Sequence, residues 1–62
     1  MKFEKYEVVP LKDHANPEQC EERHAQFWGL YGINKDDDAY AVGDFSSKTA
    51  AEFIRDALEA SH

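Results

Sequence analysis

A short polar stretch holds the side chains that come closest to forming a reactive site: His14, Cys20 and His24. Imidazole and thiolate groups are zinc ligands, and Cys20 and His24 have the i, i+4 spacing that brings two side chains together on a helix. A zinc site needs a fourth ligand, for which Asp13 or Glu21 is available. The spacing matches no strong zinc signature, so ordinary surface histidines are the alternative.

Other chemistry finds less support in the sequence. Cys20 beside His24 is the candidate for a nucleophile and its base, but the surrounding segment has too few apolar residues to hold such a pair in place. A calcium loop starting at Asn34 fails because Ala39 and Phe45 occupy the places that require a glycine and a bidentate glutamate. We therefore expect no enzymatic activity and no cofactor.

The charge balance narrows the class of partner. Thirteen acidic residues oppose seven basic ones, for a formal net charge of -6. Nucleic acids and anionic membranes both bind through clustered Lys and Arg, so we expect neither as a direct partner. A protein with a basic surface suits this charge, although the acidic residues also serve solubility alone.

The compartment is predicted from cysteine usage and hydropathy. Cys20 is the only cysteine, which is typical of a reducing compartment rather than of secretion. The opening residues MKFEKYEVVPLKD contain no apolar run of signal-peptide length, and no segment has the roughly 18 apolar residues of a membrane span. We expect a cytoplasmic protein.

The elements that would position any site are short. The 62 residues are expected to form a single small domain spanning 1–62. Residues 2–9 are rich in strand-forming side chains and end at Pro10, which cannot donate to a ladder. Residues 10–25 form a polar loop or contain a short helix that begins at Asn16 and Pro17.

The second half of the chain gives clearer signals. Residues 26–33 and 39–45 predict an antiparallel hairpin, joined by the polar break NKDDD. Residues 47–60 predict a helix with Ser46 or Ser47 as its N-cap. Its apolar residues recur at helical spacing and form one stripe: Ala50, Phe53, Ile54, Ala57 and Leu58.

These elements predict an α+β fold of order β-β-β-α, a three-stranded antiparallel sheet with the amphipathic helix packed on one face. A regular hairpin register would place Trp28, Leu30, Ala41 and Phe45 on one face. It would place Phe27, Tyr31, Ile33, Tyr40 and Val42 on the other. One helix covers only one face, so some of these aromatic residues would await a partner, unless residues 10–25 fold over them.

The junction DFSSKTAAEF resembles a pattern of small proteins from phages, plasmids and bacterial genomes. In that pattern a strand ends in Asp-Phe, a Ser/Thr cap follows, and an Ala-rich amphipathic helix closes the chain. FWGLYG resembles the central strand of such proteins, and the likeness covers roughly residues 26–60. It implies a small protein of unknown function, in some cases an acidic inhibitor of a host protein, and it assigns no site residue.

The function expected from the sequence is protein–protein contact, with self-association as a homodimer through the open sheet face as its simplest form. The predicted contact residues are Phe27, Tyr31 and Tyr40, and the aspartates Asp36, Asp37 and Asp38 would steer a basic partner. Two alternatives stay open. One is an inhibitor or DNA mimic that binds a basic surface of a nucleic-acid-binding protein, and the other is a metal-binding module using His14, Cys20 and His24.

Overall fold

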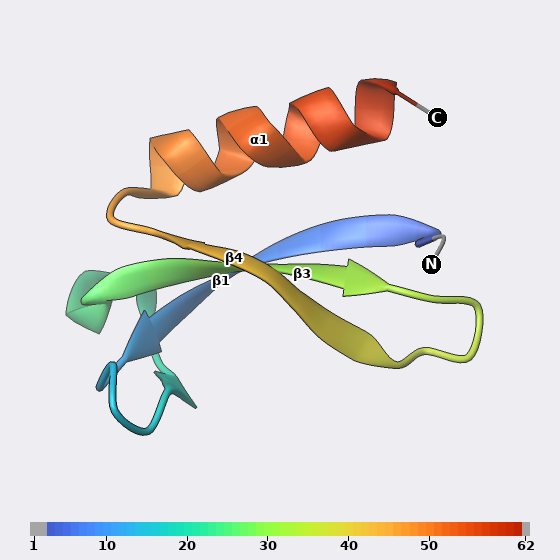
Figure 1. Cartoon of the computed structure of the whole chain (residues 1–62). Coiled ribbons are helices and arrows are strands. Elements are labelled where there is room, and N and C mark those ends of the chain that lie inside the picture. Colours follow the sequence, from blue (N-terminus) through green and yellow to red (C-terminus); the bar gives the residue numbers. More distant parts are fainter. Residues whose placement is uncertain (1–2, 62) are drawn as a thin grey trace.

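The computed structural model describes residues 3–61. It is an α+β fold in which one helix lies along one face of an antiparallel sheet (Figure 1). The sheet has four strands in the order β2-β1-β3-β4, one more strand than predicted. The elements in chain order are β1 (Lys5–Lys12), β2 (Glu18–Gln19), the 3-10 helix η1 (Glu22–His24), β3 (Phe27–Ile33), β4 (Ala39–Phe45) and α1 (Lys48–Ala60).

The first strand continues through Pro10, where the sequence predicted its end. The Pro10 carbonyl accepts a hydrogen bond from the Cys20 backbone N–H at 3.1 Å, on the side of β1 that faces β2. In an antiparallel strand the N–H and C=O of one residue point the same way, so the missing N–H of Pro10 faces β2 and costs no bond to β3. The strand can therefore extend to Leu11 and Lys12, which pair with Gln19 and Glu18.

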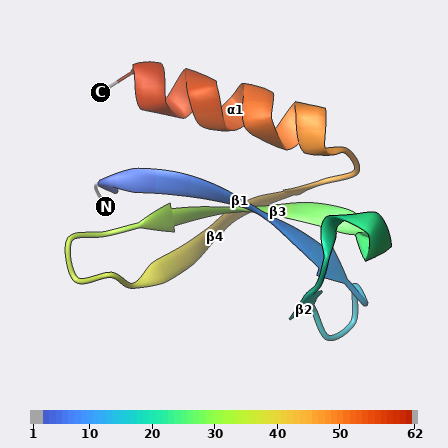
Figure 2. The same ribbon diagram turned by 180° about the vertical axis from the view of Figure 1, so that it is seen from behind.

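The segment predicted as a loop or short helix is built differently. Asn16 and Pro17 do not begin a helix, because this stretch turns the chain back into β2. Asp13 makes the turn: its φ is 65°, and its carboxylate accepts from the N–H groups of Ala15 and Asn16 at 3.2 and 3.3 Å. Figure 2 shows β2 on the side of the sheet away from α1, with η1 beside the end of the sheet.

The predicted hairpin is confirmed, with β4 at the predicted bounds and residues 34–38 as its loop. Asn34 organises that loop through its side-chain oxygen, which accepts from the N–H groups of Asp36 (2.9 Å) and Asp38 (3.0 Å). Asp37 takes a left-handed backbone conformation with φ 66°. Asn and Asp tolerate such turns because their short polar side chains bond to the nearby backbone.

A β-bulge changes which residues share a face. Leu30 pairs with Gly43 but Tyr31 pairs with Ala41, so Val42 is an extra residue in β4. Cross-strand partners lie on the same face, and the bulge therefore reverses the facing of β4 toward the hairpin tip. Tyr40 consequently lies on the face with Gly32, and Ala41 lies on the other; the predicted placement of both was wrong.

The two faces of the sheet carry different side chains. The helix face carries Tyr6, Val8, Trp28, Leu30, Gly32, Tyr40, Gly43 and Phe45, and α1 packs over it. The open face carries Lys5, Glu7, Val9, Leu11, Phe27, Gly29, Tyr31, Ile33, Ala39, Ala41 and Asp44. Leu30, at the centre of the helix face, is the one large side chain that is fully buried among the described residues.

The helix begins where the sequence predicted. The Ser47 hydroxyl caps it by accepting from the Ala50 N–H at 3.1 Å. At the same end, Lys48 Nζ donates to Glu22 Oε1 at 2.7 Å, and this hydrogen bond, with the carboxylate charge, raises the pKa of Lys48 above its usual value. No helix within residues 3–61 is long and apolar enough to cross a membrane.

The rotation of the helix about its axis differs from the prediction. Ala51 is fully buried and Leu58 is half-buried, whereas Phe53 is 72% exposed. Only two residues join β4 to α1, so the cap at Ser47 fixes which side of the helix meets the sheet. The small Ala51 side chain then lets the helix approach closely, and the predicted stripe faces partly outward.

Candidate functional site

The three potential metal ligands have different environments in the structure. The His14 ring stacks on Phe27, with 4.0 Å between ring centroids, and thereby covers part of the open face. Cys20 is a half-buried free thiol after β2, and His24 is exposed in η1. Across residues 3–61, no group of three or more His, Cys, Asp and Glu side chains is placed to hold a metal ion.

The three predicted aromatic contact residues have three different environments. Phe27 lies on the open face but is only 3% exposed, so it contributes to the core there. Tyr40 lies on the helix face, 41% exposed, with its ring 6.1 Å from that of Phe3. Tyr31 alone is both on the open face and partly accessible, as predicted for a contact residue.

The acidic residues Asp36, Asp37 and Asp38 are exposed at the tip of the β3–β4 hairpin. Asp38 directly precedes Ala39, so the acidic tip adjoins one end of the open face. Their backbone N–H groups donate hydrogen bonds to Asn34 within the loop. The tip is therefore available to attract positive charge from outside.

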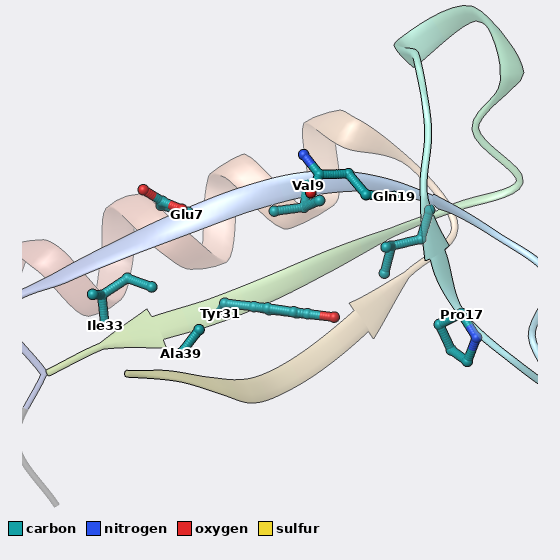
Figure 3. A pocket seen from close by; sticks show the side chains of 8 residues that line it. Glu7, Val9, Pro17, Gln19, Tyr31, Ile33 and Ala39 are labelled. Atoms are coloured by element: carbon teal, nitrogen blue, oxygen red, sulfur yellow. The ribbon is translucent and has the colours of Figure 1, made fainter. Parts of the chain in front are cut away.

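The open face contains a shallow depression of about 310 Å³ (Figure 3). It is lined by residues from all four strands and the turn before β2: Glu7, Val9, Leu11, Pro17, Gln19, Tyr31, Ile33 and Ala39. Most of these side chains are apolar, and Glu7 and Tyr31 are the titratable ones. The depression fits one side chain of a partner rather than a large ligand.

Tyr31 forms much of the floor because of a glycine two residues before it. The Tyr31 ring leans over Gly29: a Cβ built there would lie 3.5 Å from the ring carbon Cζ and 2.7 Å from Leu11 Cδ1. A Cβ at this position would displace Leu11 Cδ1, whereas its distance from the Tyr31 ring is an ordinary contact. Figure 3 shows Tyr31 lying along the sheet, with its hydroxyl toward the side on which Pro17 stands.

The depression is closed on one side only. Pro17 and Gln19 form a wall at the β2 side. Ile33 and Ala39 mark the opposite end, next to the acidic hairpin tip. Glu7 lies on the rim and pairs with Lys5 at 3.7 Å, with both side chains more than half exposed.

The sequence identified only Tyr31 among these lining residues. Val9 and Leu11 share a face with Glu7 by strand alternation, but the predicted end of the first strand at Pro10 hid that pattern. Pro17 and Gln19 reach the site only because β2 pairs with β1, and a two-residue strand has no local signature. Ala39 reaches it because of the bulge at Val42.

Comparison of the chain with protein-family models, with curated proteins and with solved structures found no match in any of the three. The candidate site therefore stands on the geometry alone, and the resemblance at the strand-to-helix junction adds no site residue.

Proposed function

We propose that this protein is a non-enzymatic interaction domain that holds an apolar side chain of a basic partner protein in the open-face depression. The observation that carries the proposal is the apolar depression itself, which adjoins an acidic hairpin tip in a chain of net charge -6. An apolar anchor inside a charged rim is the usual composition of a protein contact. Cys20, a lone free thiol, supports a reducing compartment such as the cytoplasm.

Charge favours a basic partner over a second copy at this face. Stacking two open faces would place the carboxylates of Glu7 and Asp44 from both copies in one contact. Like charges juxtaposed across a contact weaken it. A partner with Lys or Arg around a Leu, Ile or Phe anchor would instead neutralise these carboxylates, and its association would weaken with added salt.

Peptide titration followed by backbone amide NMR tests the proposal. The probes are two blocked hexapeptides of equal length, one alternating Lys with Leu and the other alternating Glu with Leu. We expect the basic peptide to shift the amides of Val9, Tyr31, Ile33 and Ala39, and the acidic peptide to leave them in place. Equal responses to both peptides, or shifts confined to α1, would contradict the assignment of this face.

A further inference from the structure

The most exposed large apolar side chains among residues 3–61 come from two neighbouring elements. They are Tyr40, Val42, Phe53 and Ile54, with exposed fractions of 41%, 42%, 72% and 36%. Tyr40 and Val42 belong to β4, and the other two belong to α1. We call these four residues together with the free edge of β4 the β4–α1 edge.

Helix geometry places Phe53 on the flank of α1 that lies toward β4. Successive residues of a helix turn by about 100°. With Ala51 and Leu58 directed at the sheet, Lys48 and Ile54 lie on opposite flanks. Phe53 lies on the same side as Ile54 but farther from the sheet. Lys48 bonds to Glu22 of η1, which contacts β1. The Phe53 flank is therefore turned toward β4, the strand nearest the viewer in Figure 1.

The strand below this flank has an unpaired edge. Among residues 3–61, β4 is the outermost strand and bonds only to β3, so one side of its seven-residue backbone lacks a neighbouring strand there. Edge strands are commonly protected by charges, but β4 carries only Asp44, which lies on the open face. The bulge at Val42 limits how regular a new ladder could be, so apolar side chains must supply much of any contact made here.

We propose that the β4–α1 edge is a homodimer contact, in which two copies meet about a two-fold axis with their β4 strands antiparallel. A second copy fits because this edge is nearly free of charge in a chain whose net charge of -6 opposes self-association elsewhere. Phe53 and Val42 of one copy would be covered by the same residues of the other, as a two-fold contact requires.

Charge complementarity supports the same arrangement. In antiparallel order, Ala39 of one copy lies near Phe45 of the other. The acidic tip at residues 36–38 then approaches the first turn of the second copy's α1. That turn contains no acidic residue and begins with Lys48. The N-terminal end of a helix favours negative charge, so the tip and the helix end are matched in sign.

The size of the contact predicts its strength. Both β4 and the α1 flank are about 20 Å long. A contact of this length that involves only one strand and one helix flank buries less than the roughly 800 Å² of surface per partner in a standard interface. We therefore expect a dimer that dissociates on dilution. This proposal does not depend on the open-face site.

Sedimentation equilibrium of the full chain, from micromolar to millimolar concentration, tests it. We expect the mass to rise with concentration from 7.1 kDa toward twice that value. Phe53→Glu should weaken association at least about tenfold, and Val42→Lys should do the same through the strand. Tyr31→Glu adds the same charge on the open face, away from this contact, and should leave association unchanged.

Three results would overturn the proposal: a wild-type mass of 7.1 kDa at every concentration, wild-type association by both edge variants, or loss of association with Tyr31→Glu alone. Far-ultraviolet circular dichroism of each variant shows whether it is folded. Because Phe53 and Val42 are exposed, we expect both edge variants to keep the wild-type spectrum.

Discussion

Phe53 and Leu30 are large apolar residues in opposite environments. Leu30 is fully buried between the sheet and α1, whereas Phe53 is 72% exposed. Removing a buried side chain leaves a cavity that its neighbours fill only in part, so Leu30→Ala should reduce the free energy of unfolding by about 2–5 kcal/mol. Phe53→Ala should change it by less than about 0.5 kcal/mol in dilute solution.

Urea unfolding of the two variants at low protein concentration makes this comparison. The apolar period of residues 50–58 alone predicts that Phe53→Ala is as damaging as a core substitution. A loss at Phe53 equal to that at Leu30 would therefore mean that the helix is rotated as its periodicity suggests, with Phe53 on the sheet.

Gly32 is a second residue whose role is visible only in the structure. A Cβ built at Gly32 would lie within 2.5–2.7 Å of three atoms of the Phe3 ring, closer than real side chains approach. The ring sits there beside Tyr6 and Tyr40, with centroids 5.7 and 6.1 Å away. Gly32→Ala should displace the Phe3 ring and reduce the free energy of unfolding by about 1–3 kcal/mol.

Gly43→Ala is the matched control, because its nearest contact would be an ordinary 3.4 Å to Phe45. In thermal unfolding, the melting temperature should fall clearly for Gly32→Ala and change little for Gly43→Ala. In a Phe3→Ala background the penalty at Gly32 should largely disappear. A penalty that persists without the Phe3 ring would assign the strain to the backbone instead.

At the scale of elements, the β3–β4 hairpin depends on one side chain. Asn34 Oδ1 accepts two backbone hydrogen bonds within the loop, at 2.9 and 3.0 Å. In Asn34→Ala these two backbone N–H groups can bond only to water. The substitution should reduce the free energy of unfolding by about 1–2 kcal/mol. Lys35→Ala, in the same loop at an exposed position, should stay within about 0.5 kcal/mol of wild type.

Amide hydrogen exchange measures the effect where it occurs. Loss of Asn34 should speed exchange at the tip and at the adjoining ends of β3 and β4, and leave α1 protected. Equal behaviour of the Asn34 and Lys35 variants would show that the loop is held by its backbone alone.

How much of each element the sequence predicts follows from the range of the interactions involved. The hairpin at 34–38 and the cap at Ser47 depend on neighbours along the chain, and both were predicted. β2 forms through its pairing with Leu11 and Lys12, and no local sequence pattern predicts it. The same holds for the side of α1 that meets the sheet, which is fixed by the short β4–α1 connection.

The candidate site illustrates the same limit. Tyr31 was predicted as a contact residue because both hairpin faces were aromatic. Phe27 was assigned to the same surface, but His14 from the distant turn stacks on it. Tyr40 was moved to the helix face by the bulge at Val42. Side-chain alternation alone predicts faces only where the ladder is regular.

The whole molecule offers two proposed contact surfaces: an open face for a basic partner and the β4–α1 edge for a second copy. The sheet separates them, because the depression lies on the side away from α1. The acidic tip takes part in both contacts, but the depression itself stays uncovered in the dimer, so a dimer would present two equivalent depressions to its partner.

Two equal substitutions on the open face show whether the depression binds the partner. Ala39 lines the depression, and Ala41 lies on the same face of β4 outside its lining; both are exposed. Ala39→Phe should fill the depression and reduce the NMR-measured affinity for the Lys-Leu peptide at least about tenfold. Ala41→Phe should leave it near the wild-type value. Equal affinities for the two variants would contradict the claim that this depression is the binding site.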